Sequence, residues 1–359
     1  QTLPESTSIC KGKNYMGKPT SAITIWFNKS GLSNFAVIES IKASAQPGEE
    51  FYFIGSHNRS DFALSAICDK FVVEPEGLKG EDYVEWCLAF AVENGVRVFF
   101  PDRGVEDLAM VRDKFEAAGV HLMVPTDGET LAAIDHKGRQ YELIGKAVAD
   151  IPDYRIVTNL EQFDAACAEL AAGHERICFK PAVSIFGAGF RYITGEGSAV
   201  SRLLNGNVTA ISMAEARFIL GQEERFRDLM VMEYLPGPEY SVDCLAVGGE
   251  VVQAVCRVKV ADRVQELPAK SEALAAAARL ARHLKMDGIF NAQFRNKDGV
   301  LYLLEVNARM SGGLYVTFHS GLSLPYWAVR LAIGTARPED VPAPATGVRV
   351  GQLHRSITM

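Results

Sequence analysis

Three polar side chains at two-residue spacing end an apolar stretch in the last quarter of the chain. Residues 300–307 are mostly apolar, yet Glu305, Asn307 and Arg309 follow one another at every second position. Residues two apart in a strand share a face, so these side chains are predicted to point the same way. Carboxylate and amide oxygens are ligands for magnesium, and a guanidinium suits phosphate. The spacing indicates a magnesium–phosphate site, and a buried strand end with a solvated Glu–Arg pair is an equally open interpretation.

A second apolar run precedes this stretch and adds a third oxygen ligand. Residues 289–294 are strand-like and are separated from the first run by the sequence NKDG at 296–299. Asp-Gly between two apolar runs is a hairpin signal. On the partner strand of this hairpin, Gln293 is predicted to reach the face that carries Glu305 and Asn307.

A lysine at the end of another apolar strand gives an independent signal. Residues 177–181 read as a strand in which Lys180 follows three apolar residues. A buried ammonium without a partner is costly, so this lysine requires an anion unless its side chain reaches solvent. The loop that follows contains Gly187 and Gly189, whose backbone N–H groups can cover a bound anion. The lysine and the loop together favour an anion site.

Composition bounds the class of protein. The chain has 359 residues, 48% hydrophobic and 23% charged, enough for about two or three domains with their own cores. The net charge of −7 argues against a nucleic-acid or anionic-membrane surface. No apolar run reaches the ~18 residues of a membrane helix, and no secretory signal is visible. Seven scattered cysteines without a Cys-x-x-Cys pair argue against zinc and disulfides, so we expect a reducing cytoplasm.

The first part of the chain alternates between strand-like and helical patterns. The expected strands are residues 22–27, 51–54, 71–73, 96–100 and 120–124, and the expected helices are 34–45, 81–93 and 108–118. This alternation is typical of a parallel sheet covered on both faces. Ligands of such sheets bind beyond the carboxyl ends of the strands, where this chain has Asn28, Gly31, Arg59 and Arg103. Ordinary turn chemistry and solvated arginines are the simpler explanation of these four residues.

The remainder of the chain has a different pattern. Its expected elements are helices at 132–149, 160–172, 268–284 and 322–333, and strands at 155–157, 177–181, 192–194, 229–233, 240–247, 250–260 and 348–353, besides the hairpin of 289–307. The strands from residue 229 onward read as an antiparallel sheet, with Gly248-Gly249 as a hairpin turn.

Taken in order, these residues resemble the ATP-grasp superfamily of ATP-dependent ligases. The resemblance rests on Lys137, on Lys180 with its glycine loop, on the sequence EYLPGPE at 233–239, on Gln293 and on EVNAR at 305–309. It covers roughly residues 22–335 and is greatest to the branch of the carbamoyl-phosphate synthetase large subunit and small carboxylate–amine ligases. The loop after Lys180 is poorer in glycine than the family's usual loop and carries Ile185 and Phe186.

The resemblance implies a fold and a division into domains. The fold is α/β plus α+β, an ATP-grasp fold with an N-terminal parallel, Rossmann-like α/β domain. We expect a disordered or expression-derived tail at 1–20 and the N-terminal (pre-ATP-grasp) domain at 21–126. Linker helices and a small lid domain are expected at 127–228, and the large domain with the metal site at 229–359.

The resemblance also implies a role for each matching residue. The implied contacts are the nucleotide phosphates for Lys137, Lys180, Gly187 and Gly189, the adenine edge for Glu233, Tyr234 and Leu235, the ribose for Glu239, and Mg²⁺ or Mn²⁺ for Gln293, Glu305 and Asn307. Arg309 is implied beside the transferring phosphate, so Arg309, Lys180 and Glu305 are the expected catalytic residues. Whether Arg59, Arg103, Asp243, Arg257 or Lys259 contacts the substrate stays open.

The expected activity is that of an ADP-forming ligase. ATP would activate a small carboxylate as an acyl phosphate, and an amine would then displace phosphate. One alternative is a carboxyphosphate- or carbamate-forming enzyme, which the Gln-Glu-Asn set favours although a second synthetase half is missing. Another is a non-catalytic ATP-binding regulatory protein. We expect no nucleic-acid or membrane partner, and for the oligomeric state, which stays open, a homodimer is one alternative.

Overall fold

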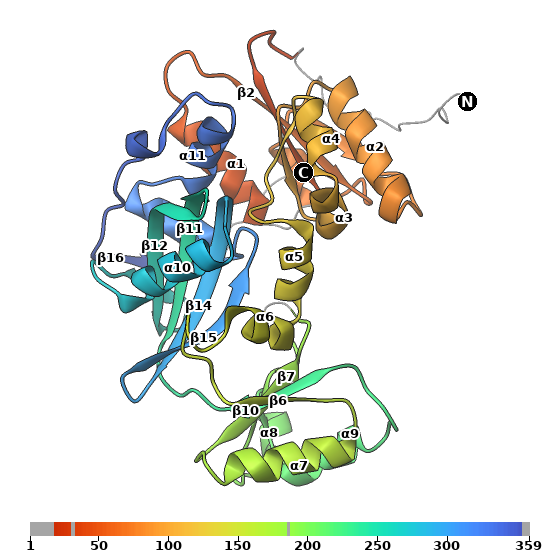
Figure 1. Ribbon diagram of the computed structural model, residues 1–359, viewed down its shortest axis with the longest axis vertical. Coiled ribbons are helices and arrows are strands. Elements are labelled where there is room, and N and C mark those ends of the chain that lie inside the picture. Colours follow the sequence, from red (N-terminus) through yellow and green to blue (C-terminus); the bar gives the residue numbers. More distant parts are fainter. Residues whose placement is uncertain (1–17, 30–32, 185–186, 354–359) are drawn as a thin grey trace. The chain divides into compact units, whose positions relative to one another are not determined.

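The computed structural model describes residues 18–29, 33–184 and 187–353 (Figure 1). Most of the expected tail, together with Gly31 of the first loop and with Ile185 and Phe186 of the glycine loop, lies outside the described residues. The chain divides into two compact units. The first is made of Gln1–Ala132, Tyr240–Ala292 and Val306–Met359, and the second of Ala133–Glu239 and Gln293–Glu305. The domain division at residues 20, 126 and 228 stays a prediction.

A five-stranded parallel sheet forms the N-terminal part of the first unit, which confirms the alternating pattern. Its strands are β1 (Ile23–Asn28), β2 (Phe51–His57), β3 (Lys70–Val73), β4 (Val98–Pro101) and β5 (His121–Leu122), in the order β3-β2-β1-β4-β5. Its helices are α1 (Ser33–Ser44), the 3-10 helix η1 (Ala63–Ala66), α2 (Gly80–Glu93), α3 (Val105–Met110) and α4 (Arg112–Ala117). The helix expected at 108–118 is two helices, because Val111 leaves the helical conformation with ψ at 25°.

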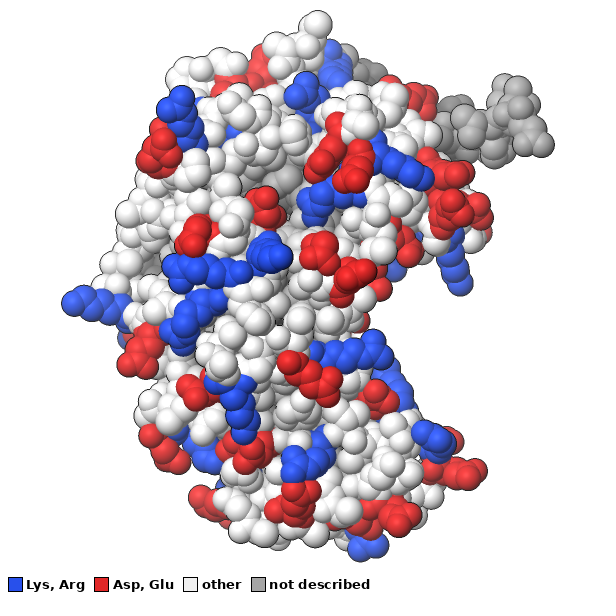
Figure 2. Space-filling model, in the orientation of Figure 1, with Lys and Arg blue, Asp and Glu red and all other residues white. Residues whose placement is uncertain are grey.

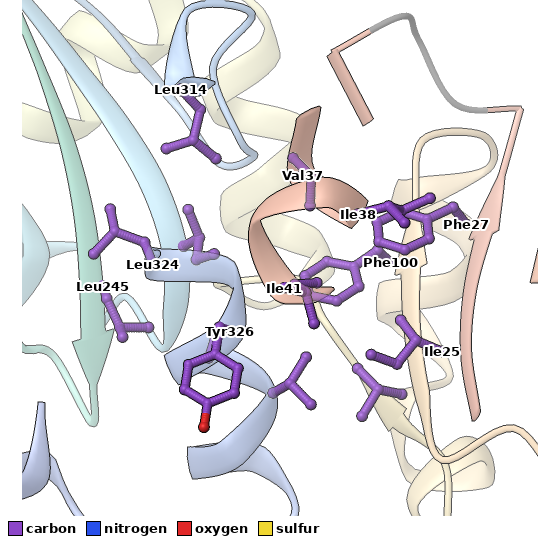
Figure 3. Close-up of a cluster of buried hydrophobic side chains, with 14 of the residues drawn as sticks. Ile25, Phe27, Val37, Ile38, Ile41, Phe100, Leu245, Leu314, Leu324 and Tyr326 are labelled. Carbon is purple, nitrogen blue, oxygen red and sulfur yellow. The ribbon is translucent and has the colours of Figure 1, made fainter. Parts of the chain in front are cut away.

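Alternate residues of β1 enter two different cores, so both faces of this sheet are buried. Phe27 belongs to a cluster with Ile38 of α1 and Leu324. Figure 3 shows the side chains of α1 between strand residues such as Phe27 and residues of the carboxyl-terminal part such as Leu324. On the opposite face Trp26 stacks on Phe99, with ring centroids 3.9 Å apart. The apolar strands of the sequence therefore reflect burial on two sides.

The second sheet of the molecule has six strands in the order β15-β14-β11-β12-β13-β16. Their bounds are β11 (Glu239–Val247), β12 (Glu250–Ala261), β13 (Val264–Leu267), β14 (Gly288–Lys297), β15 (Val300–Asn307) and β16 (Val348–Gly351), accompanied by α10 (Glu272–His283), α11 (Leu324–Ala332) and the 3-10 helices η2 (Leu314–Ser320) and η3 (Pro338–Asp340). The division between the units passes through β11, β14 and β15.

Both hairpins expected in this sheet are present. Strands β11 and β12 pair antiparallel around Gly248-Gly249. Strands β14 and β15 are neighbours joined at Asp298 and Gly299, which have φ of 53° and 84°. Two consecutive positive φ angles match the type of hairpin turn that Asp-Gly favours.

The second unit contains a five-stranded sheet in the order β6-β10-β7-β8-β9. Its strands are β6 (Tyr154–Val157), β7 (Ile177–Pro181), β8 (Arg191–Ile193), β9 (Ala210–Ile211) and β10 (Leu229–Glu233), and its helices are α6 (Lys137–Ile144), α7 (Leu160–Ala171), α8 (Ala199–Leu204) and α9 (Met213–Leu220). Strand β10 pairs antiparallel with β6 and β7, so it belongs to this sheet and not to the six-stranded one. Its core packs Phe163 of α7 against Phe179 and Val231.

The single helix expected at 132–149 is wrong, because two shorter helices occupy this part of the chain and the second ends at Ile144. The chain forms α5 (Gly128–Asp135) and α6 with His136 between them in an extended conformation, and the His136 ring accepts a hydrogen bond from the N–H of Arg139. Side-chain capping of this kind begins a new helix, so Lys137 becomes the first residue of α6.

Six cysteines lie within the described part of the chain, all as buried free thiols. No helix in that part of the chain combines the length and the apolarity needed to cross a bilayer.

Candidate functional site

Lys180 lies near the end of β7, inside the sheet of the second unit. Strand β10 covers it, with Met230 as its register partner, and only 9% of the residue is exposed. Burial lowers the pKa of Lys180 to about 8, whereas the carboxylate of Glu305 acts in the opposite direction and Lys137 lowers it further. The predicted strand-end lysine is therefore a buried ammonium beside one carboxylate and a second ammonium.

Lys137 joins this group from the first turn of α6. Its Nζ lies 3.4 Å from Oε2 of Glu305 and donates to the carbonyl oxygen of Ser184 at 2.9 Å. The residue is 5% exposed. Two buried cations therefore share one carboxylate, which leaves a net positive charge where the loop after β7 begins. Such a group has the charge to bind an anion.

The glycine loop departs from β7 directly beside these cations. Gly187 and Gly189 have φ of 66° and 79°, a conformation that favours glycine. A Cβ on Gly189 would lie 2.7 Å from Cδ of Pro181, so a larger residue cannot occupy this place without movement. The loop is held to α6 by the N–H of Lys137, which donates to the Ala182 carbonyl at 3.0 Å.

The position of Glu305 depends on contacts made by the backbone of its strand, β15. The single hydroxyl hydrogen of Tyr141 on α6 is shared between the carbonyl oxygens of Leu303 and Leu304, which lie 3.0 and 2.8 Å from the hydroxyl oxygen. This buried tyrosine fastens β15 to the helix that begins with Lys137. Gln293 lies half-buried on β14, the neighbour of β15, and Glu239 begins β11.

The segment expected to meet an adenine is fixed by its side chains. The Glu233 carboxylate accepts from Lys297 Nζ at 2.5 Å and from the N–H of Asp153 at 3.1 Å, and His174 Nδ1 lies 3.4 Å away. The backbone carbonyl oxygen of Leu235 accepts a hydrogen bond from Nη1 of Arg295 at 2.7 Å. The Glu233 side chain and the Leu235 carbonyl oxygen therefore both pair within the protein.

The group formed by Asp153, His174 and Glu233 has the ligand atoms of a cation site, all within 4.8 Å of one another. Lys297 already pairs with Glu233, and Lys146 lies 3.3 Å from Asp153. These ammonium groups balance the carboxylates, so the group acts as a structural ion-pair cluster. Beside it, the Tyr234 ring lies 5.5 Å from the ring of Tyr192.

A network of buried polar side chains lies in the first unit around Arg257. Its guanidinium donates to Asp243 Oδ2 at 2.7 Å, to Gln265 Oε1 at 2.9 Å, and to the hydroxyls of Ser241 and Ser311 at 2.9 and 3.0 Å. Arg257 and Asp243 therefore pair with each other inside the protein, which favours a structural role for both over contact with a substrate.

Asn307 and Arg309 are linked to this network by hydrogen bonds. Asn307 Nδ2 donates to Asn291 Oδ1 at 3.4 Å, and Arg309 donates to Asn307 Oδ1 at 3.5 Å. A Cβ on Gly313 would lie 2.5 Å from Nη1 of Arg257, so only glycine fits above the guanidinium. Asn291 was not singled out from the sequence, although its position two residues before Gln293 places it on the same strand face.

The polar residues at the carboxyl ends of the strands of the first sheet pair with other residues of the protein. Asn28 Oδ1 accepts from the N–H of Asp102 at 2.6 Å, and Arg103 pairs with Glu74 at 2.8 Å. Arg59 pairs with Asp61 at the surface. The Asn28 contact agrees with ordinary turn chemistry and Arg59 is a solvated arginine, whereas the expectation of a solvated Arg103 is wrong because its guanidinium pairs with the buried Glu74. Figure 2 shows basic and acidic side chains interspersed over the visible face.

The chain has an ATP-grasp fold, and it resembles the branch of the carbamoyl phosphate synthase large chain. Residues 225–356 match a family described as ATP-grasp in the biosynthetic pathway with Ter operon. The arginine-specific large chain of carbamoyl phosphate synthase from Geobacillus stearothermophilus is 25% identical over an alignment of 335 positions, which covers 88% of this chain and 29% of that protein. The chain thus spans under a third of the length of its curated relatives.

Solved structures show the same fold. The ADP complex of an N5-carboxyaminoimidazole ribonucleotide synthetase has a TM-score of 0.63 over 91% of this chain and 79% of its own, at 17% identity. The biotin carboxylase domain dimer of the 2-oxoglutarate carboxylase from Hydrogenobacter thermophilus, in complex with MgADP, ADP and bicarbonate, has a TM-score of 0.60 over 89% of this chain and 72% of its own, at 18% identity.

Proposed function

We propose that this chain is an ATP-dependent ligase that activates a carboxylate and joins it to an amine. The observation that carries the proposal is the meeting of Lys137, Lys180 and Glu305 in the second unit, two buried cations around one carboxylate. The class of reaction is supported by the ATP-grasp fold and by the resemblance to a carbamoyl phosphate synthase chain.

The reaction has two steps. An oxygen of the carboxylate attacks the γ-phosphorus of ATP, and the bond to the β–γ bridging oxygen breaks, so ADP leaves and an acyl phosphate forms. The nitrogen of the amine then attacks the acyl carbon, phosphate leaves with the bonding electrons, and the nitrogen loses a proton to give the amide. Phosphoryl transfer depends mainly on positioning and on neutralising spread negative charge, which suits a site built from cations.

Each residue has a proposed part in these steps. Lys137 and Lys180 bind the phosphates, and the loop with Gly187 and Gly189 covers them and excludes the water that would hydrolyse an acyl phosphate. The backbone from Glu233 to Leu235 binds adenine, and Glu239 binds the ribose hydroxyls. Arg309 contacts the transferring phosphate and stabilises the oxyanion of the second step, together with N–H groups near Gly312 and Gly313.

A divalent cation fits the donor set proposed for it. Gln293, Glu305 and Asn307 are oxygen donors, of which one is a carboxylate, and this combination suits Mg²⁺ or Mn²⁺. When bound, the cation would supply positive charge to the β- and γ-phosphates. Glu305 is the carboxylate of this donor set; it lies 3.4 Å from Lys137 Nζ, so a cation would share its oxygens with that ammonium group.

The proposal is tested by incubating the protein with ATP and Mg²⁺ against a panel of small carboxylates crossed with amines. We expect phosphate release above background only with particular pairs, and an amide product in the same wells. Nucleotide binding without phosphate release across the whole panel would instead favour a regulatory ATP-binding protein.

A second candidate is an enzyme that forms carboxyphosphate or carbamate. The Gln293–Glu305–Asn307 set and the resemblance to carbamoyl phosphate synthase favour it. In the same assay it predicts phosphate release with bicarbonate as the only added carboxylate. Release that needs an organic carboxylate contradicts this candidate and supports the first.

A further inference from the structure

The side chain of Asn307 has an oxygen end and a nitrogen end, and only the oxygen can ligate a cation. The contacts with Arg309 and Asn291 identify the oxygen end and the nitrogen end. Arg309 can only donate, and it lies 3.5 Å from the end assigned as Oδ1. The other end, Nδ2, donates to Oδ1 of Asn291 at 3.4 Å. The contact with Asn291 therefore favours the orientation in which the Asn307 oxygen faces away from Asn291.

The orientation of Asn291 is itself fixed by acceptors. Its Nδ2 lies 2.9 Å from Asp243 Oδ1 and 3.0 Å from Ser241 Oγ, and its side chain is fully buried. A carboxylate only accepts hydrogen bonds, so the end of Asn291 that faces Asp243 must be the nitrogen. A flipped Asn291 would place its oxygen against a buried carboxylate, at the cost of an unpaired polar contact.

Asp243 is held in turn by Arg257. The guanidinium Nε donates to Asp243 Oδ2 at 2.7 Å, which leaves Oδ1 to accept from Asn291. Arg257 is only 6% exposed, and its other donors reach Gln265 and two serines. An ordered series thus runs from Arg257 through Asp243 and Asn291 to Asn307, and all four residues lie in the first unit.

We propose that Asn291 is a positioning residue that turns the Asn307 amide so that its oxygen is presented to a divalent cation. The inference rests on the proposed function, in which Asn307 ligates the metal that accompanies ATP. Asn291 acts through its contact with Asn307 and has no contact with the cation itself. Partners that orient a metal ligand commonly change metal affinity by 10- to 100-fold when they are removed.

The test compares nucleotide affinity with and without metal. Calorimetry measures binding of the non-hydrolysable analogue adenylyl imidodiphosphate, once with saturating Mn²⁺ and once with EDTA, and the ratio of the two affinities is the metal contribution. We expect Asn291→Leu to reduce this ratio by ~10-fold or more while the affinity in EDTA stays within about twofold. A general loss of structure would lower both affinities together.

Gln265→Leu is the matched control. It removes the acceptor of Arg257 Nη1 and leaves an unpaired buried donor in the same network, but it does not touch Asn291. We expect it to keep the metal contribution of the wild type. Because Leu at position 291 leaves Asp243 Oδ1 without its partner, Asn291→Ser is the second variant if the first does not fold, and the same loss is expected because a freely rotating hydroxyl fixes no amide orientation.

The outcomes are distinct. If Asn291→Leu or Asn291→Ser keeps the metal contribution of the wild type, the inference is overturned and the proposed function stands. Equal losses in the Asn291 and Gln265 variants also overturn it, since they reduce the network to structural support. Absence of a metal contribution in the wild type contradicts the proposed function and the inference together.

Discussion

At the scale of single residues, the candidate site depends on buried charges that the fold leaves unbalanced. Lys137 and Lys180 are both nearly buried, and Glu305 is the acid that faces them. A buried ammonium is expensive unless an anion accompanies it, so these lysines cost stability in the free protein. A bound phosphate removes that cost, which is the physical reason to expect nucleotide affinity at this place.

Lys180→Ala removes one of the two cations. We expect the loss of one charge-assisted phosphate contact to cost ~1.5–3 kcal/mol, or roughly ten-fold or more in ATP affinity. Calorimetric titration with ATP and Mg²⁺ measures it, with the exposed Lys114→Ala as the control. Unchanged affinity in Lys180→Ala would remove this lysine from the site.

Nucleotide affinity should also depend on pH through Lys180. Burial lowers the pKa of Lys180 to about 8, so the free protein loses this charge as the pH rises through 8. A phosphate prefers the charged form, hence affinity should be highest below pH 8 and should fall toward pH 9. Lys180→Arg keeps a charge that does not titrate in this range and should flatten the dependence. An equally steep profile in the arginine variant would assign the titration to another group.

Glu305 and Arg309 should divide metal binding from chemistry. Glu305→Gln keeps the size but removes the charge that offsets the cation, so we expect both metal affinity and rate to fall. Arg309→Lys keeps the charge but loses the planar fork that grips two oxygens, so nucleotide binding should stay nearly intact while kcat falls by ~10²-fold or more. ATP affinity and kcat of both variants are measured at saturating Mg²⁺. If Arg309→Lys weakens ATP binding as much as Glu305→Gln does, yet turns over normally once saturated, Arg309 is a ground-state anchor instead.

At the scale of elements, a break between two helices and the hydrogen bonding of one tyrosine position the functional side chains. His136 interrupts a helical pattern, and the interruption makes Lys137 the first residue of α6. The Tyr141 hydroxyl on the same helix then bonds two carbonyl oxygens of β15 just before Glu305. One helix thereby sets the places of a lysine and of the carboxylate that it faces.

Removal of the Tyr141 hydroxyl tests this fastening. Tyr141→Phe keeps the buried ring but removes the one donor that the two carbonyl oxygens share, so we expect a loss of about 1–3 kcal/mol in the free energy of unfolding. Equilibrium urea denaturation measures the loss. Tyr154→Phe is the control, because its hydroxyl makes only a 3.4 Å contact with the Gly138 carbonyl. Equal stability of the two variants would show that the hydroxyl does not fasten β15.

At the scale of the whole molecule, two compact units share one chain that passes between them repeatedly. In the first unit a single apolar core includes Ile25 and Phe100 of the parallel sheet together with Leu245 and Leu324 of the carboxyl-terminal part. The second unit has its own core around α7. Lys180 and Glu305 belong to the second unit, and Asn307 belongs to the first although it follows Glu305 by two residues.

The proposed reaction predicts which nucleotide leaves. The cations and the proposed metal ligands are assigned to the β- and γ-phosphates, so turnover should release ADP and phosphate. Chromatography of the nucleotide after turnover with a productive pair of substrates measures the products. AMP and pyrophosphate as the main products would exclude an acyl-phosphate mechanism, with a reaction lacking the carboxylate as the control.

The sequence by itself determined the features that repeat at short range. Strands and helices follow from periods of two and of about 3.6 residues, so the parallel sheet and both hairpins were predictable. The order of Lys137, Lys180, Glu305 and Asn307 along the chain was sufficient for the resemblance to ATP-grasp proteins. The roles proposed for these residues stay predictions.

Only the tertiary structure decided how the polar side chains are paired. Glu233 meets Lys297 across 64 positions of the chain, and Arg257 meets Ser311 across 54. Such contacts leave no local period, because a hydrogen bond between distant residues needs only that the fold bring two atoms together. For the same reason the sequence left Arg257 open as a substrate contact, whereas in the structure it is buried and makes four hydrogen bonds inside the protein.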